Sequence, residues 1–350
     1  MVEFSSSEAV RFIKENIPSW SSLQLEEMQF NKTIGNSNKV YVVSNSAGLT
    51  PAKIIFRIFG PNDVTDKRRE NKIFNKLAEL GIGPKMLGHE PGLRLEEYWD
   101  GFAPIPRKWL FDPNVNKKIA DLLRTYHSQG MSDTLNESTL ICIEHPRKWR
   151  ALAQARLAEN PNITNRKQEL AEVTQLLSDE NWRLYLSILP STARTVFIHG
   201  DPSELNFLYN ERLDEVRFVD YEFAGFGYAA CDLAYIINEA QYEYDYPEYP
   251  YWSFVPEDLP TYQQIADFIT FYGGGKELFI QVQQMMIASH YHWAMWSLAM
   301  YKGDRDGYDY LGYALLRYRE FKTKYSRYIA EGGQASLVSR AELYFGDKSS

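Results

Sequence analysis

Two short apolar runs that each end in an aspartate constrain the fold of this chain more than any other feature. The first run, residues 196–198, leads into the His-Gly-Asp triplet 199–201, and Asn206 follows five residues after the aspartate. The second run, residues 216–219, leads directly into Asp220, fourteen residues after Asn206. Asp and Asn are also common in ordinary turns between strands, which is the simplest alternative. The full spacing is much rarer than a single His-x-Asp and indicates two strands that deliver polar side chains to one site.

These residue types are the ones that phosphoryl transfer needs, because that reaction depends on positioning and on neutralising charge. We expect Asp201 to orient the attacking hydroxyl and accept its proton, and Asn206 and Asp220 to supply oxygen ligands for Mg²⁺. His199 is expected to brace the loop and not to act as an acid or base. Glu222 lies two residues beyond Asp220, and in an extended strand it would face the same side. It is expected either to reach the metal through water or simply to end the strand.

The order of predicted elements divides the 350-residue chain into a small sheet-rich lobe and a larger helical lobe. The expected strands lie within residues 30–43, around a turn, and at 54–60 and 93–98. The expected helices are residues 4–17, 67–80, 114–129, 166–189, 261–272, 276–302, 308–329 and 338–345. The predicted organisation is an N-terminal lobe at 1–98, a linker at 99–105 and a helical C-terminal lobe at 106–350.

Composition excludes several classes of protein. Hydrophobic residues make up 44% of the chain, which is enough for a large core, yet no apolar run approaches the ~20 residues of a membrane span. The net charge of -8 argues against nucleic acid as a partner and is compatible with a cationic substrate. The start of the chain lacks the pattern of a signal peptide, and the two cysteines, Cys142 and Cys231, form no metal-binding pattern. We therefore expect a cytoplasmic protein.

A buried arginine marks the small lobe as a candidate phosphate-binding unit. Arg57 lies inside an apolar strand and needs a counter-charge, for which Glu70 in the following helix is the natural partner. Such a pair is expected to hold ATP phosphates, although a purely structural salt bridge is the alternative. The turn that contains Gly35, Ser37 and Asn38 is a candidate for covering the phosphates with backbone N–H groups, and it is equally typical of a plain hairpin.

Aromatic residues make up 15% of the chain and gather in its second half. Trp293 and Trp296 are three residues apart, so they share one face of a helix. Other aromatic or acidic side chains are close in sequence, namely Glu239, Tyr242, Tyr244, Tyr308 and Tyr313. A helical core is the simpler interpretation. Rings beside a carboxylate are also what a quaternary ammonium needs, because it cannot donate ordinary N–H hydrogen bonds.

Taken together, these motifs resemble the choline/ethanolamine kinase family over about residues 30–325. The residues that carry the resemblance are 199–201 with Asn206, 219–222, 228, 232, 238–239, 242–244, 249–250 and 293–297, and, in the small lobe, 57–60, Glu70, 83–85 and 94–96. The resemblance implies an α+β, two-lobed protein-kinase-like fold. It implies ATP and Mg²⁺ as cofactors, phosphorylation of the hydroxyl of choline as the reaction, ethanolamine as a second small-molecule acceptor, and a homodimer. It also places Glu96, Glu97 and Tyr98 among the nucleotide-binding residues.

Two departures from the family pattern keep rival functions open. The phosphate turn has one glycine, Gly35, where the family usually has a pair, and the triplet reads His-Gly-Asp where the family has His-Asn-Asp. The triplet is closer to that of antibiotic phosphotransferases with the same fold. An ethanolamine kinase and an aminoglycoside-type phosphotransferase are therefore the enzymatic alternatives. A non-catalytic pseudokinase that acts as a binding module is the non-enzymatic one.

Overall fold

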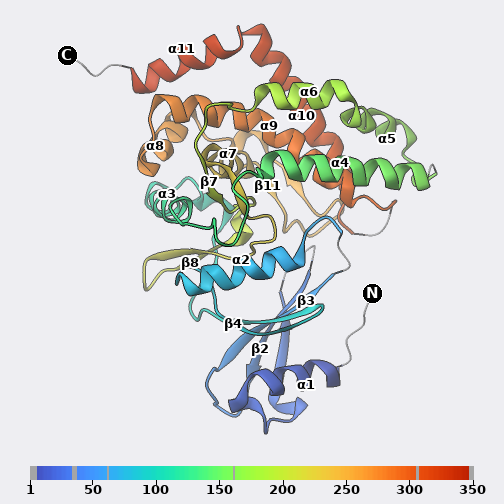
Figure 1. Ribbon diagram of the computed structural model, residues 1–350, viewed down its shortest axis with the longest axis vertical. Coiled ribbons are helices and arrows are strands. Elements are labelled where there is room, and N and C mark those ends of the chain that lie inside the picture. The colour runs from blue at the N-terminus through green and yellow to red at the C-terminus, as the bar shows by residue number, and fades with distance from the viewer. Residues whose placement is uncertain (1–5, 34–37, 61–62, 161, 305–306, 347–350) are drawn as a thin grey trace. The chain divides into compact units, whose positions relative to one another are not determined.

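The chain forms two compact units, drawn from blue to red along the sequence in Figure 1. The computed structural model describes residues 6–33, 38–60, 63–160, 162–304 and 307–346. Unit 1 comprises Met1–Phe102 and unit 2 comprises Ala103–Ser350. The boundary between the units therefore falls within residues 99–105. The assignment of the units as an ATP-binding lobe and a catalytic lobe stays a prediction.

Unit 1 is built on a five-stranded antiparallel sheet with the order β1-β2-β3-β5-β4. Its strands are β1 (Met28–Lys32), β2 (Asn38–Asn45), β3 (Lys53–Phe59), β4 (Met86–Glu90) and β5 (Leu93–Glu97). In the register between β3 and β5, Arg57 lies opposite Arg94. Two arginines on neighbouring strands repel each other unless carboxylates lie between them, so the register itself demands acidic partners.

Two helices accompany this sheet, α1 (Ser6–Asn16) and α2 (Lys67–Glu79). Helix α2 begins where the Asp66 side chain accepts hydrogen bonds from the backbone N–H groups of Arg68 and Arg69, both at 3.1 Å. Its buried residues Ile73, Phe74 and Leu77 recur at the three- and four-residue spacing of one helix face. A separate apolar core joins α1 to the sheet and includes Phe12, Ile13, Trp20, Ile54, Phe56 and Leu95.

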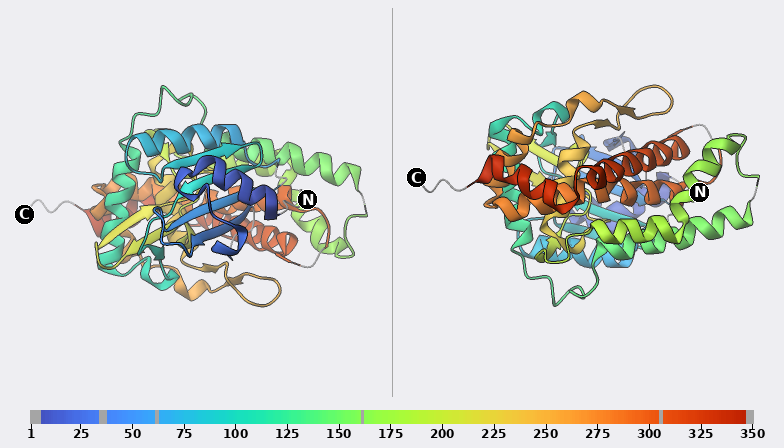
Figure 2. Two further views of the ribbon diagram at one scale, coloured as in Figure 1. Left: turned by 90° about the horizontal axis from the view of Figure 1, so that it is seen from below. Right: turned by 90° about the horizontal axis from the view of Figure 1, so that it is seen from above.

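Unit 2 is mainly helical. Its helices are α3 (Pro113–His127), α4 (Ile141–Glu159), α5 (Lys167–Val173), α6 (Asp179–Ile188), α7 (Ala229–Glu239), α8 (Tyr262–Tyr272), α9 (Lys276–Met300), α10 (Tyr310–Ala330) and α11 (Gln334–Phe345). The long helix α9 packs against α4, α7 and α10, and Figure 2 shows α10 running beside it. Among the described residues, no helix is both long enough and apolar enough to cross a membrane.

Short strands in unit 2 carry the polar loops of interest. These strands are β6 (Ala103–Pro104), β7 (Thr195–Ile198), β8 (Phe207–Asn210), β9 (Glu215–Phe218), β10 (Gly225–Tyr228), β11 (Tyr242–Glu243) and β12 (Ser253–Phe254). Strand β8 pairs with both β6 and β9, whereas β7 pairs with β10 and β11 pairs with β12. His199 follows directly after β7, and Asp220 lies two residues after β9.

The predicted α+β class is confirmed, but some predicted elements are wrong or missing. The single helix expected at 166–189 is broken into α5, a 3₁₀ turn (Thr174–Leu177) and α6. The break has a local cause, because Ser178 caps α6 by accepting a hydrogen bond from the backbone N–H of Asn181 at 3.2 Å. Helices α4 and α7 were not predicted. All eleven residues of α7 are buried, so it has no polar face to produce a periodic pattern.

Candidate active site

The loop after β7 is held by a buried carboxylate. Asp232 of α7 accepts hydrogen bonds from the backbone N–H of His199 (2.8 Å, Oδ2) and of Gly200 (2.9 Å, Oδ1). Gly200 has φ +82, and a Cβ built there would lie 2.4 Å from the backbone oxygen of Phe223. Only glycine fits this position. Asp232 was identified only as part of the family resemblance, yet its carboxylate anchors the loop that carries Asp201.

His199 is positioned to brace this loop. Its side chain is fully buried, its Nε2 is 3.0 Å from the carbonyl oxygen of Val219, and its ring stacks on Phe218 at 4.3 Å between centroids. Burial lowers the pKa of His199, so the neutral ring donates its Nε2 hydrogen to Val219. This bond joins the loop after β7 to the segment after β9. A direct part in the reaction stays a prediction.

Asp201 and Asn206 lie in contact. The Asn206 side-chain amide donates from Nδ2 to the backbone oxygen of Asp201 (2.8 Å) and to its Oδ2 (3.1 Å). With its nitrogen so oriented, Asn206 presents Oδ1 as the atom that can bind a metal. Burial raises the pKa of Asp201 well above its usual value, and the charges of Glu239, Asp220 and Glu222 raise it further. Asp201 thus lies among three other acidic groups.

The predicted geometry of Glu222 is wrong. Strand β9 ends at Phe218, Asp220 has φ 66, and Glu222 lies in a turn, so Asp220 and Glu222 are not alternate residues of one strand. The turn follows from the left-handed backbone at Asp220, which Asp tolerates better than most residues. Both side chains still contribute negative charge around Asp201.

The residues near Asp201 fit a magnesium ion as a partial ligand shell. Asn206 and Asp220 provide hard oxygen donors, which Mg²⁺ prefers while keeping several waters and binding phosphate oxygens. Within the described ranges, no three or more His, Cys, Asp or Glu side chains form a group able to hold a metal. The set therefore does not form an all-protein cage. It suits an ion that arrives with a nucleotide.

In unit 1 the structure shows an alternating row of charges around Arg57. Arg57 Nε donates to Glu96 Oε1 at 2.7 Å, and Arg94 Nε donates to the same oxygen at 2.8 Å. Arg94 also pairs with Glu70 at 3.0 Å, and Lys67 pairs with Glu70 at 3.2 Å. Glu96, which was predicted only as a nucleotide-binding residue, is therefore a counter-charge for Arg57. Burial would raise the pKa of Glu96, but the two arginines outweigh it and lower the pKa.

The other residues predicted to bind the nucleotide are not brought together as clearly. The Asn38 side chain accepts a hydrogen bond from the backbone N–H of Gly60 at 3.4 Å. Glu97 Oε2 accepts one from the backbone N–H of Lys85 at 3.1 Å, and the ring of Tyr98 lies 5.1 Å from the Lys53 ammonium. Two further predicted residues, Gly35 and Ser37, lie outside the described residues. Nucleotide binding by this set stays a prediction.

In unit 2, acidic and aromatic side chains form a hydrogen-bonded cluster. Glu239 Oε2 accepts a hydrogen bond from the Tyr244 hydroxyl, and its Oε1 accepts one from Arg317 Nη2 at 2.5 Å. The hydroxyls of Tyr244 and Tyr313 are 2.8 Å apart, and the Arg317 guanidinium lies 3.5 Å from the centroid of the Tyr242 ring. Arg317 was not predicted. Its sequence context, one basic residue in a mixed helix, gave no signal.

The two tryptophans occupy different environments. Their rings meet edge to face at 5.8 Å, and Trp296 also lies 6.4 Å from Tyr313, which in turn lies 5.8 Å from Tyr308. Trp296 is half-buried and joins the cluster of Glu239 and Tyr244 through Tyr313. Trp293 is 5% exposed and packs against Trp149 at 6.5 Å. The structure therefore brings Trp296, Tyr308 and Tyr313 together and sets Trp293 deeper in the core.

Glu204 is an acidic residue that the sequence analysis missed. It lies three residues after Asp201 in a 3₁₀ turn (Glu204–Asn206) and is 6% exposed. Burial raises its pKa to about 8, and the charge of Glu239 raises it further. Glu204 could have been predicted from its position in the sequence, because an acidic residue inside the predicted catalytic loop is close to both Asp201 and Asn206.

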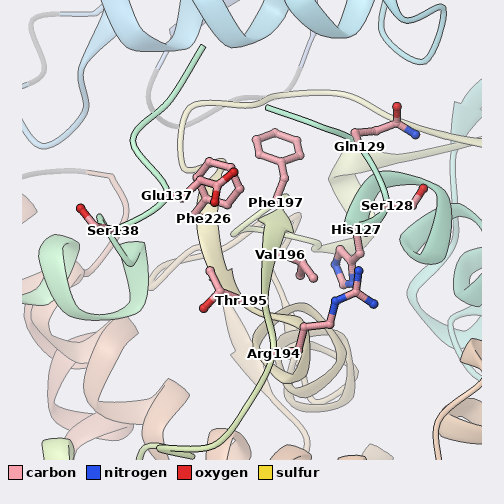
Figure 3. A pocket seen from close by; sticks show the side chains of 10 residues that line it. All are labelled: His127, Ser128, Gln129, Glu137, Ser138, Arg194, Thr195, Val196, Phe197 and Phe226. Carbon is pink, nitrogen blue, oxygen red and sulfur yellow. The ribbon is translucent and has the colours of Figure 1, made fainter. Parts of the chain in front are cut away.

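A separate cavity of about 450 Å³ lies beside β7 and is shown in Figure 3. Its lining residues are His127, Ser128, Gln129, Glu137, Ser138, Arg194, Thr195, Val196, Phe197 and Phe226. None of them is a predicted site residue. One lining residue nevertheless contacts Asp232, which holds the loop after β7, because His127 Nε2 is 3.1 Å from Asp232 Oδ2.

Comparison with known proteins gives one consistent result. The family model for choline/ethanolamine kinase matches residues 31–322. A choline/ethanolamine kinase of Homo sapiens is 27% identical over 347 residues, covering 91% of this chain and 84% of the human protein. Ethanolamine kinase 2 of Rattus norvegicus is 27% identical over 327 residues, covering 90% and 80%.

The fold is also shared with a solved structure. The crystal structure of a choline kinase from Cryptosporidium parvum Iowa II has a TM-score of 0.77 to this chain at 23% sequence identity, covering 96% of this chain and 99% of the other. This likeness confirms the predicted protein-kinase-like fold.

Proposed function

The chain belongs to the choline/ethanolamine kinase family, and from that membership we propose that it transfers the γ-phosphoryl group of ATP to the hydroxyl of choline, with ethanolamine as a second acceptor. The observation that carries the proposal is the pairing of Asp201 with Asn206, in a loop fixed by Asp232. A fixed carboxylate with an adjacent metal ligand is what in-line phosphoryl transfer requires. A cytoplasmic location and a homodimer stay predictions from the sequence.

In the proposed reaction the acceptor's hydroxyl oxygen bonds to the γ-phosphorus while the bond from phosphorus to the bridging oxygen breaks, releasing ADP. Asp201 orients the hydroxyl and takes its proton as the bond to phosphorus forms. Arg57 contributes charge for the phosphate oxygens. Asn206 and Asp220 would hold Mg²⁺, which would supply positive charge to neutralise the phosphates.

The aromatic cluster supports an amino alcohol as the acceptor. Trp296, Tyr308 and Tyr313 meet through their rings, and Tyr244 links Tyr313 to the carboxylate of Glu239. Such faces attract a quaternary ammonium through their quadrupoles. Both oxygens of Glu239 already accept hydrogen bonds from the chain itself. This favours choline, because its ammonium group has no N–H to donate.

An ADP-release assay with choline, ethanolamine, an aminoglycoside and no acceptor tests the proposal. We expect ADP formation with the two amino alcohols, dependent on Mg²⁺, and background rates with the aminoglycoside. Preferential turnover of the aminoglycoside would support the antibiotic-type alternative. ATP binding without turnover of any acceptor would support the pseudokinase.

A further inference from the structure

Glu204 has a feature that the proposed reaction does not explain. Its carboxylate is buried, and within the described part of the chain its Oε2 atom accepts no hydrogen bond. Two other buried carboxylates of unit 2 have donors: Asp232 accepts from two backbone amides, and Glu239 accepts from Arg317 and Tyr244. Burying an oxygen atom without a hydrogen-bond donor costs free energy of folding. Such an atom is therefore a candidate for binding a ligand or a water molecule.

The charges around Glu204 favour a cation as that ligand. Glu239 and Glu243 are both close enough to repel its negative charge, and Arg107 is the cation that attracts it. The Arg107 guanidinium is already engaged, because Nη1 donates to the backbone oxygen of Ala240 at 2.5 Å and lies 2.6 Å from Asp258 Oδ2. The surroundings of Glu204 are therefore net acidic.

Glu204 is related to both parts of the proposed acceptor site. Along the chain it lies three residues after Asp201, which is placed at the reacting hydroxyl. The charge of Glu239, which belongs to the aromatic cluster, acts on Glu204 and helps to raise its pKa. An amino alcohol has its hydroxyl and its nitrogen only two carbons apart, so a group next to both regions can contact the ammonium end.

We propose that Glu204 contacts the ammonium group of the acceptor and favours ammonium ions that can donate N–H hydrogen bonds; the proposal rests on the proposed function. Ethanolamine would donate an N–H to the unpartnered Oε2. Choline has no such donor and would gain only the charge attraction. Glu204 thus supports binding of ethanolamine, while the rings of the cluster support binding of choline.

The test is calorimetric binding to the full chain and to Glu204→Gln, with Mg²⁺ and a non-hydrolysable ATP analogue present. The ligands are ethanolamine, choline and dimethylbutanol, the uncharged carbon isostere of choline. We expect Glu204→Gln to weaken ethanolamine binding roughly 10- to 100-fold, the range for hydrogen bonds to charged groups. Choline binding should weaken about 3- to 10-fold. Binding of dimethylbutanol should not change.

Thermal melting separates this function from a structural one. Because no described residue donates a hydrogen bond to Oε2, Glu204→Gln should melt at the same temperature as the parent or higher. Glu243→Gln is the matched control, since Glu243 is a nearby carboxylate whose Oε2 already accepts from Ser253 Oγ at 3.0 Å. Its effect on each ligand should stay below about twofold. If Glu204→Gln does not fold, Glu204→Asp keeps the charge, and its shorter side chain should still weaken ethanolamine binding most.

Three results would overturn the inference. One is an equal loss for all three ligands, and another is a fall in melting temperature with unchanged ligand ratios. The third is a change in Mg²⁺ or nucleotide affinity alone, which would place Glu204 at the metal. If the parent protein neither binds nor phosphorylates either amino alcohol, the proposed function fails, and this inference fails with it. If the parent phosphorylates both and Glu204→Gln leaves their ratio unchanged, only the inference fails.

Discussion

At the scale of single residues, Asp201 is central to the proposed chemistry. Asp201→Asn keeps the shape of the side chain and removes the proton acceptor. We expect kcat to fall by roughly 10²- to 10⁴-fold. The melting temperature should stay nearly unchanged, because the loop is anchored through the backbone amides of His199 and Gly200. Steady-state kinetics and thermal melting of both proteins measure this. Near-normal turnover in the variant would show that another group takes the proton.

The two tryptophans should respond differently to the same substitution. Trp296→Phe changes a half-buried ring beside Tyr313, so choline binding should weaken by about 0.5–2 kcal/mol while ATP affinity stays constant. Trp293→Phe changes a ring that is 5% exposed and packed on Trp149. It should mainly lower thermal stability, by about 1–3 kcal/mol. Calorimetry and melting on both variants give the comparison. Equal losses of choline affinity would place both rings in the pocket wall.

The pKa of Glu204 makes stability depend on pH. Its folded value of about 8 lies above the ordinary value of 4.5, so its contribution to stability is full at low pH and is lost as the pH rises from about 4.5 towards 8. Glutamine does not titrate. The melting temperature of Glu204→Gln, relative to the parent without ligands, should therefore rise by roughly 2–10 °C between pH 5 and pH 8. A constant difference would mean that the folded carboxyl titrates at its ordinary pKa.

Some of the site residues were predictable from the sequence and others were not. Asp201 and Asn206 followed from their spacing, because five residues suffice to turn a short loop back on itself. Glu204 lies in the same loop, but its burial and its unpartnered oxygen depend on distant segments. Asp232 and Arg317 act through bonds to residues 33 and 78 positions away in sequence. No local pattern encodes contacts at that separation.

At the scale of elements, strand β3 presents the positive charge of Arg57, and we expect that charge to affect the KM for ATP. Arg57→Ala should raise the KM for ATP more than the KM for choline, because the guanidinium is assigned to phosphate oxygens. Folding should survive the change, since Glu96 keeps its 2.8 Å bond to Arg94. Lys53→Ala, on the same strand, is the matched control and should change neither KM. An equal rise in both KM values would favour the structural salt bridge.

The helices that were predicted differ from those that were missed in their exposure to solvent and in their proline content. Helix α2 has a buried face at regular spacing and an exposed remainder, so its bounds were predicted within one residue. Helix α7 is buried throughout, and α4 contains Pro146. A fully buried helix has no amphipathic pattern, and a proline argues against a helix in any local reading.

At the scale of the whole molecule, the fold is less dependent on sequence than the site is. A choline kinase at 23% identity has a TM-score of 0.77 to this chain. Backbone hydrogen bonding and a binary apolar pattern allow many sequences to reach one fold. The order of a sheet-rich region followed by a helical region could therefore be predicted from the pattern of apolar residues in the sequence. We expect the balance between choline and ethanolamine to depend on a few side chains, such as Glu204 and Trp296, whose surroundings only the folded chain defines.

The net charge of -8 gives the last prediction, because an acidic protein attracts a cationic acceptor over long distances. With ATP saturating, kcat/KM for choline should fall a few-fold between about 0.01 and 0.2 M salt, as the screening length shrinks from about 30 Å to below 10 Å. The uncharged isostere dimethylbutanol is the internal control, and its kcat/KM should not depend on salt. Glu239 and Glu204 act at short range, so salt should screen them less than it screens the overall field. Equal salt responses for both acceptors would show that the field of the molecule does not steer the substrate.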